Sequence, residues 1–306
     1  MNAKSKHVDP REYDRDWIKE TWGWDTPEEF IRSQGRNLRP RVHYSLAIAN
    51  LQPGMRILDV GCGRGEVVLY CARRGIEAVG VDFSAEVISL AEEARATHTA
   101  EQQRRMRFVC DDVKNIREKA FDRIFLLDLV EHLYDWELDQ LFEVCRGLLK
   151  PEGELIIHTL PNVWVYEILY AKLFRLFLPW LPRDPRGEKE KAIHVNEMSI
   201  THLHRRLRHN RFNTRIWVND LITRQAKWHE VGELSGKRSK LYQWMRKPFV
   251  SGLFQALCLT PLRVLIANDI FAVARHEGKS IPFRRPMRQN WTESVILSIY
   301  MRGADR

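Results

Sequence analysis

The feature that most constrains the fold of this chain is the stretch MRILDVGCGRG, from Met55 to Gly65. A short apolar run is followed by three glycines at alternate positions, Gly61, Gly63 and Gly65, and a helical pattern then begins. This order predicts a buried strand, a tight turn and a helix. Glycines let the turn adopt positive φ and let a ligand approach the main chain, and the helix amides add donors. An ordinary strand-to-helix turn has the same pattern, so the downstream sequence has to distinguish the two.

Downstream of the glycine turn, apolar runs that read as strands alternate regularly with helical patterns. Such alternation predicts right-handed βαβ units and a parallel sheet with helices on both faces. The chain is 306 residues long and 44% hydrophobic, which is enough for one large, well-buried core. The predicted strands are Arg56 to Val60, Ala78 to Val81, Met106 to Cys110, Arg123 to Leu127 and Glu154 to Thr159.

Acidic residues stand at or near the carboxyl ends of four of these strands: Asp59, Asp82, Asp112 and Asp128. Open α/β sheets bind ligands at this edge. A dinucleotide site would need a third glycine where Glu66 stands, and a carboxylate there would repel a pyrophosphate. No sequence of the P-loop type occurs. The turn therefore suits a nucleoside ligand without a diphosphate.

Six motifs in order resemble those of the class I S-adenosylmethionine-dependent methyltransferases. They cover the glycine turn, the ends of the next three strands and the start of the fifth. The resemblance implies a Rossmann-like, doubly wound α/β fold with a mainly parallel seven-stranded sheet, an antiparallel last strand and helical insertions. The motifs are DVGCGRG (59–65), VGVDFS (79–84), FVCDDV (108–113), FDRI (121–124), LVEHL (129–133) and LKPEGE (149–154).

The same resemblance implies S-adenosyl-L-methionine as the cofactor. Asp82 would accept hydrogen bonds from both ribose hydroxyls, and Phe83 would lie on the adenine face. Asp112 would accept from the adenine amine while the amide of Val113 donates to the ring. Asp59 would help to hold the methionyl ammonium group. The remaining expected cofactor-binding residues are Gly61, Cys62, Gly63, Gly65, Asp128 and Leu129.

Methyl transfer requires a positioned acceptor and a route for its proton. Candidate residues at the right strand ends are Glu131, His132 and His158. His194 begins a segment that resembles the H-x-x-x-x-S segment of small-molecule and lipid-precursor methyltransferases. We take His194 as the first candidate for acceptor contact or general base and His132 as the second. A packed or solvated histidine is an equally good reading of either.

No metal site is expected from the spacing of cysteines or histidines. The five cysteines show no C-x-x-C spacing, which also argues against disulfides. His202, His204 and His209 do not share one helical face. Nucleic acid is a less favoured partner, because the motif after the fourth strand differs from that of base-amine methyltransferases and no cysteine follows a proline.

The net positive charge lies in the second half of the chain, which carries +14, against −5 for residues 1–160. Two long insertions in that half, 161–193 and 219–268, combine basic and apolar residues. The stretch from Val163 to Leu181 predicts an amphipathic helix that is too polar to span a bilayer. It suits an anionic membrane surface, although a lid packed on the protein's own core is an open alternative.

We therefore expect a methyltransferase domain at 46–276, a helical cap at 1–45 and a basic tail at 277–306. The expected acceptor is an oxygen of a small molecule, a lipid-linked intermediate or a glycan precursor of the cell envelope. An RNA methyltransferase or a non-catalytic interaction protein remains the alternative. The first residues contain no apolar stretch, so we expect a cytoplasmic protein, peripheral on the inner face of the membrane if the insertions bind it.

Overall fold

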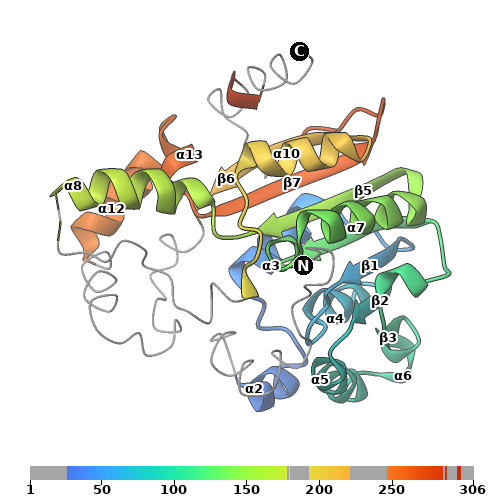
Figure 1. Cartoon of the computed structure of the whole chain (residues 1–306). Coiled ribbons are helices and arrows are strands. Elements are labelled where there is room, and N and C mark those ends of the chain that lie inside the picture. Colours follow the sequence, from blue (N-terminus) through green and yellow to red (C-terminus); the bar gives the residue numbers. More distant parts are fainter. Residues whose placement is uncertain are drawn as a thin grey trace, which may run out of the picture.

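The computed structural model describes residues 26–177, 179, 193–220, 247–284, 287 and 295–297. These residues build a seven-stranded sheet of order β3-β2-β1-β4-β5-β7-β6, with β7 antiparallel to both neighbours (Figure 1). The predicted fold class is confirmed. The strands are β1 Arg56–Val60, β2 Glu77–Asp82, β3 Met106–Cys110, β4 Phe121–Leu127, β5 Leu149–Thr159, β6 Phe212–Asn219 and β7 Asp269–His276.

Helices cover both faces of the sheet, and alternate strand residues feed two separate cores. On β1, Leu58 belongs to one core and Ile57 to the other, as the two-residue period of a strand requires. The first core packs under α7 and α10, and the second under α3, α4 and α5. The helices that frame the sheet are α3 Pro40–Ala49, α4 Glu66–Ala72, α5 Ala85–Ala96, α6 Ala100–Gln103, α7 Asp135–Leu148 and α10 Ile200–His209.

The described part of the N-terminal segment consists of α2, Pro27–Arg32, and α3. Thr26 caps α2 as its sequence predicts: its hydroxyl accepts from the Glu29 amide at 3.2 Å, and its own amide donates to the Glu29 carboxylate at 2.9 Å. The sequence predicts a second helix from Arg36 to Asn50, whereas α3 begins at Pro40. The residue before a proline is pushed out of the helical region, and Arg39 is extended.

Glu154 on β5 ties the sheet to three other parts of the chain. Its buried carboxylate lies 3.2 Å from Nε of Arg123 on β4, 2.8 Å from Arg275 on β7 and 2.6 Å from Arg284, which follows β7. Burial by itself would raise the pKa of Glu154, but the three guanidinium groups outweigh it and lower the pKa. This ion cluster lies at the edge of the sheet opposite the one that carries the glycine turn, and it ties β4, β5 and β7 together there.

The two insertions lie together beside the carboxyl end of β5 (Figure 1). Asn162 joins them, because its side-chain amide donates to the carbonyl oxygens of Val264 at 2.9 Å and Ala267 at 3.0 Å. The first insertion contains a π-helical stretch η5, Val165–Phe174, followed by α8, Arg175–Phe177. The second contains α12, Pro248–Leu257, and α13, Arg263–Ile266. None of the described helices is both long and apolar enough to cross a membrane.

The predicted single helix from Val163 to Leu181 is therefore only partly an α-helix, since most of its described length winds as a π-helix. Trp164 and Leu169 pack against the first core, as the lid alternative predicts. Several predictions lie outside the described residues. They concern residues 1–25 of the N-terminal cap, most of the first insertion beyond residue 177, the basic residues between 237 and 246, and most of the tail beyond residue 284.

Candidate functional site

The glycine turn is bent back onto the neighbouring strand β2. The amides of Gly61 and Cys62 both donate to the carbonyl oxygen of Val81, at 2.8 and 3.1 Å. All three glycines have positive φ, 69° at Gly61, 51° at Gly63 and 87° at Gly65, which side chains disfavour. The predicted strand, turn and helix are therefore confirmed, with α4 beginning directly after Gly65.

Two of the glycines are also required by what packs on them. A Cβ on Gly65 would lie 2.6 Å from Cζ of Phe108 on β3, closer than real contacts allow. A Cβ on Gly61 would lie 3.1 Å from Cδ1 of Leu129, which follows β4. Leu129 thus covers the turn on the side of the residues that follow it in the chain, Glu131 and His132.

Asp82 holds the turn from the end of β2. One carboxylate oxygen accepts from the Gly63 amide at 3.0 Å, and the other accepts from the Ser84 amide at 2.9 Å. Burial raises the pKa of Asp82, and these amide donors partly offset that rise. The side chain is thereby fixed in orientation at the mouth of the turn.

Phe83, Asp112 and Val113 follow the ends of β2 and β3, at the same edge of the sheet as Asp82. The ring of Phe83 is 44% exposed, a large fraction for an aromatic side chain at this sheet edge. The amide of Asp111 donates to the Asp82 carbonyl at 3.0 Å and so joins the ends of β2 and β3. Asp112 caps the 3₁₀ turn η3, Val113–Asn115, by accepting from the Lys114 amide at 2.9 Å.

Under the turn lie Asp59 and Glu66, both buried. Burial, followed by the charges of Glu66 and Asp82, raises the pKa of Asp59 well above its usual value. Glu66 differs, because Arg39 at 2.7 Å and Arg64 at 2.9 Å neutralise it. The sequence argument treated Glu66 as an unpaired charge, whereas its carboxylate is paired with Arg39 and Arg64 inside the protein.

Asp128, after β4, is held by cations on both sides. Its Oδ1 lies 2.5 Å from Nδ1 of His158 on β5, and its Oδ2 lies 2.6 Å from Nε of Arg41. Nε2 of His158 lies 3.0 Å from the carboxylate of Asp269 on β7. Burial would raise the pKa of Asp128, but Arg41 and His158 outweigh it and lower it strongly. His158 is fully buried, so this candidate for acceptor contact is enclosed between two carboxylates.

Glu131 and His132 form the short 3₁₀ turn η4, Val130–His132, three residues beyond Asp128. The buried Glu131 accepts from the Thr159 hydroxyl at 2.8 Å. Burial, then the charge of Asp128, raises the pKa of Glu131 to about 8. Burial, then His194, lowers the pKa of His132 to about 4, so its imidazole is neutral at pH 7.

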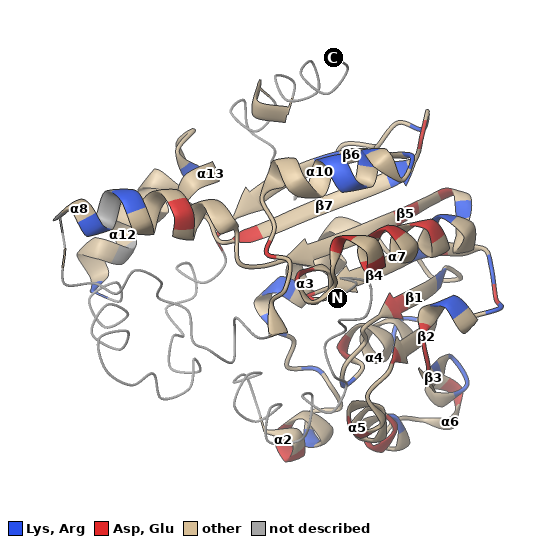
Figure 2. Cartoon of the chain, in the orientation of Figure 1, with Lys and Arg blue, Asp and Glu red and all other residues tan. Residues whose placement is uncertain are grey.

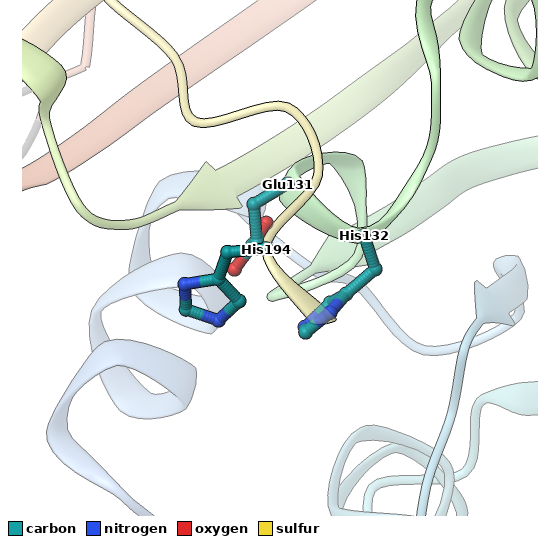
Figure 3. Close-up of side chains that lie close together, drawn as sticks. All are labelled: Glu131, His132 and His194. Atoms are coloured by element: carbon teal, nitrogen blue, oxygen red, sulfur yellow. The ribbon is translucent and has the colours of Figure 1, made fainter. Parts of the chain in front are cut away.

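His194 lies against these two residues although 62 positions separate it from His132 in the chain. The ring centroids of His132 and His194 are 4.8 Å apart, edge to face. The segment that carries His194 is tied to η4, because the Asn196 amide donates to the Glu131 carbonyl at 3.0 Å. Glu131, His132 and His194 therefore come together as one group (Figure 3).

Several residues of the site were missed by sequence reasoning. Arg39 and Arg41 precede and begin α3 with no motif around them, and Asp269 and Thr159 looked like ordinary strand ends. Of the three helix histidines, the buried His204 bonds the Thr214 hydroxyl at 2.6 Å and His202 lies 3.1 Å from Asp135. These two therefore face different partners and form no common group.

Residues 37–245 match the family described as mycolic acid cyclopropane synthetase, which is more than half of the chain. The chain belongs to this family. It is thereby a class I S-adenosylmethionine-dependent methyltransferase by family, and the predicted family and cofactor are confirmed.

Curated relatives include two ubiquinone biosynthesis O-methyltransferases. That of Bradyrhizobium diazoefficiens is 32% identical over 161 residues, 52% of this chain and 60% of the relative. That of Nitrobacter winogradskyi is 33% identical over 157 residues, 51% of this chain and 56% of the relative. The chain thus matches little more than half the length of these relatives.

Solved structures with the same fold include two cyclopropane synthases. CmaA1, complexed with SAH and CTAB, has a TM-score of 0.51 and 19% identity, over 76% of this chain and 82% of that one. MmaA2 from Mycobacterium tuberculosis has a TM-score of 0.50 and 18% identity, over 88% of this chain and 92% of that one. At this identity the likeness concerns the fold.

The residues of the turn fit the family's cofactor. Positive φ at the glycines leaves main-chain room that a Cβ would fill, and Asp82 presents an oriented carboxylate next to the exposed ring of Phe83. The buried Asp59, whose ionised form is disfavoured, is suited to a cationic group such as an ammonium.

Proposed function

We propose that this protein transfers a methyl group from S-adenosylmethionine to an oxygen of a lipid-linked or other apolar acceptor. The observation that carries this proposal is the group formed by Glu131, His132 and His194. Leu129 precedes Glu131 in the chain and packs on Gly61, so this group lies next to the glycine turn. A donor site and a group of proton-accepting side chains thus share one edge of the sheet.

On the donor side, Asp82 would hold the ribose hydroxyls, Phe83 the adenine face and Asp59 the ammonium group. Asp112 and Val113 would contact the adenine edge. Asp128 would act by holding the strand ends, since its carboxylate is engaged by Arg41 and His158. When bound, the cofactor supplies an activated methyl on a sulfonium centre. The chain's own task is then to position the acceptor oxygen in line with that methyl.

On the acceptor side, the oxygen gains a methyl and loses a proton, so the product is a methyl ether and one proton is released. Glu131, His132 and His194 are the groups near which that proton would leave. A carboxyl group with a pKa of about 8 and a neutral imidazole suit proton transfer near neutral pH. Replacement of any of the three should lower the rate with little effect on cofactor affinity.

An apolar surface supports a lipid-linked acceptor. Phe249 is 83% exposed and Leu259 76% exposed on the second insertion, and Leu176 is exposed on the first. On α12, the neighbouring Val250 and Phe254 are buried, so one side of this helix packs on the core while another is open. We define the apolar edge as Leu176, Phe249, Leu253, Leu259 and Leu262.

Cationic residues accompany the apolar edge. Lys172, Arg175, Lys247 and Arg263 lie on the same elements or at their starts, against one acid, Glu167 (Figure 2). Apolar side chains with neighbouring cations are typical of surfaces that bind anionic lipid bilayers. We infer that the apolar edge rests on such a bilayer and receives the acceptor from it. The names of the relatives, ubiquinone and mycolic acid, are those of apolar long-chain compounds and favour the same class.

Co-sedimentation with vesicles tests the membrane proposal. Vesicles that contain about one third anionic phospholipid should retain the protein, and the variant Phe249→Ser/Leu259→Ser should bind at least several-fold more weakly. Phe283→Ser removes a ring that is 68% exposed outside the apolar edge and serves as the control. Equal binding by all three proteins, or none by the wild type, would contradict the proposal.

The activity itself is tested with methyl-labelled S-adenosylmethionine and an extract of the source cells, separated into organic and aqueous fractions. We expect label in the organic fraction, and we expect Glu131→Gln to reduce it about 100-fold or more, since general acid–base groups contribute at least about that factor. Label confined to RNA would contradict the proposed acceptor. The same rate of methyl transfer in Glu131→Gln as in the wild type would contradict the proposed site.

A further inference from the structure

One side chain, that of Arg39, reaches both the glycine turn and the acceptor side. Its Nε and Nη2 donate to Oε2 of Glu66 at 3.0 and 2.7 Å, and its Nη1 lies 3.7 Å from Oδ2 of Asp128. Glu66 is the first residue of α4, directly after the glycine turn, whereas Asp128 directly follows β4 and leads into η4. Arg39 therefore links the glycine turn to the strand end from which Glu131 and His132 extend.

Local structure holds both ends of the contact between Arg39 and Glu66. The residue before a proline is kept out of the helical region, and Arg39, which precedes Pro40, is extended at the N-cap of α3. On the other side, Oε1 of Glu66 accepts from Nη2 of Arg64 at 2.9 Å. The guanidinium carbon of Arg64 lies 4.1 Å from the centre of the Phe30 ring, so this second partner is packed in place.

The contact between Arg39 and Glu66 is a charged one. Burial by itself would raise the pKa of Glu66, but Arg39 and Arg64 outweigh it and lower the pKa. Glu66 is therefore ionised at neutral pH. Two hydrogen bonds from a guanidinium group to a buried carboxylate form a strong and directional pair, which fixes the start of α4 relative to the start of α3.

Asp128 has a backbone conformation that needs support. Its φ is 55°, in the left-handed region that residues other than glycine seldom adopt, and such a conformation persists where its surroundings hold it. The Asp128 amide donates to the His158 carbonyl oxygen at 3.0 Å, and its carboxylate lies between Arg41 and His158. The turn at Asp128 sets the direction in which η4 leaves the sheet, and with it the place of Glu131 and His132.

We propose that Arg39 is a positioning residue for methyl transfer, which holds the turn at Asp128 in place relative to the glycine turn and so sets where the acceptor oxygen lies relative to the methyl group. This inference rests on the proposed methyltransferase function of the same site. Arg39 acts through the carboxylates of Glu66 and Asp128, and we expect it to contact neither the cofactor nor the acceptor. A displacement of about 1 Å can slow a reaction about 100-fold, so the link matters for the rate.

The neighbouring ion pairs separate this role from stability. When Arg39 is replaced, Glu66 keeps its contact with Arg64, and Asp128 keeps its contact with Arg41. Each carboxylate therefore retains a cation, and the variants should fold. What they lose is the connection between the two turns.

The test compares three variants of the full chain with the wild type. Arg39→Gln removes the charge and the link. Arg39→Lys keeps the charge, but an ammonium group does not reproduce the forked contacts with Glu66 and Asp128. Arg105→Gln is the matched control, because Arg105 pairs at 3.3 Å with the exposed Glu101 on α6, outside both turns.

The first measurement needs no acceptor. Histidine rings are labelled with carbon-13, and the NMR signal of His132 is assigned by its loss in His132→Gln. Because the His132 ring lies 4.8 Å from that of His194, its signal responds to a small displacement of η4. We expect this signal to shift in both Arg39 variants and to stay in place in Arg105→Gln. Calorimetric affinity for S-adenosylmethionine should remain within about threefold of the wild type in all three.

The second measurement is the initial rate at which label from saturating S-adenosylmethionine enters the organic fraction of the extract. We expect both Arg39 variants to be about 10–100-fold slower than the wild type. Arg105→Gln should transfer label at the wild-type rate. A lower rate at unchanged cofactor affinity is the result that positioning predicts.

An unchanged His132 signal in Arg39→Gln would overturn the proposal, as would the full rate of transfer in either Arg39 variant. A loss of cofactor affinity as large as the loss of rate would also overturn it, since Arg39 would then belong to the cofactor site. If the His132 signal shifts as expected while the wild type labels nothing in the organic fraction, the link between the two turns stands and the proposed function fails.

Discussion

Nδ1 of His158 lies 2.5 Å from Oδ1 of Asp128, and this contact joins the ends of β4 and β5 at the centre of the site. The other ring nitrogen of His158 lies 3.0 Å from Asp269 at the start of β7, so three neighbouring strands meet on one imidazole. We therefore expect His158 to position its neighbours and not to contact the acceptor. Its protonation should therefore be visible in stability.

The pH dependence of unfolding tests this role. Burial by itself would lower the pKa of His158, but Asp128 and Asp269 outweigh it and raise the pKa to about 9. A histidine in the unfolded chain has a pKa near 6.5. The stabilisation is therefore complete below about pH 6.5 and is lost as pH rises through about 9. Urea unfolding between pH 7 and 9.5 should show a falling free energy of unfolding, and His158→Gln should remove most of that fall. The same slope in both proteins would contradict the assignment, whatever their absolute stabilities.

Packing against the glycine turn is tested by two alanine substitutions. Gly65 and Gly75 both have positive φ, 87° and 74°, so alanine is strained at either. Only at Gly65 would the new Cβ clash, with Phe108, whereas nothing lies within 4 Å at Gly75. We expect Gly65→Ala to cost about 1–3 kcal/mol more than Gly75→Ala in chemical denaturation. Equal losses would show that Phe108 moves aside without cost.

The ion cluster at Glu154 should contribute strongly to stability. Glu154→Gln leaves three buried or half-buried guanidinium groups with a weaker partner, and we expect a loss of about 3 kcal/mol in the free energy of unfolding. Glu152→Gln is the control, because Glu152 also faces Arg275 but is exposed, and it should cost less than about 1 kcal/mol. Since the pKa of Glu154 is lowered, its contribution should disappear as pH falls below about 4. A difference of less than about 1 kcal/mol between the two variants would contradict the account.

Much of the fold could be predicted from the sequence because its elements are marked locally. The first and third strands have the predicted bounds, Arg56–Val60 and Met106–Cys110, and the second and fourth differ by one or two residues at their ends. The fifth strand, Leu149–Thr159, begins five residues before the predicted Glu154. Apolar runs, glycine turns and acidic strand ends lie within a few positions of one another. The start of α3 was predicted too early, because Pro40 pushes the preceding residue out of the helical region and so sets the first turn.

The remainder depends on contacts between distant positions, which no local pattern reports. Asp269 and His158 are 111 positions apart, and Arg39 reaches Glu66 across 27. Neither Asp269 nor Arg39 stands in a local pattern that indicates its partner. That His194 meets Glu131 could not be read from spacing either, since the two residues come together only in the folded chain. The π-helical stretch was also missed, because its apolar residues fit a helix of either pitch.

Calorimetric titration with S-adenosylmethionine tests the central claim most directly. The wild type should bind one molecule per chain. Asp82→Ala should bind roughly 100-fold more weakly, because hydrogen bonds to a charged group contribute about 1.5–3 kcal/mol each. Asp82→Asn should fall between the two, and Asp111→Ala, an exposed neighbour, should resemble the wild type. No binding by the wild type at millimolar ligand, or unchanged affinity in Asp82→Ala, would contradict the account.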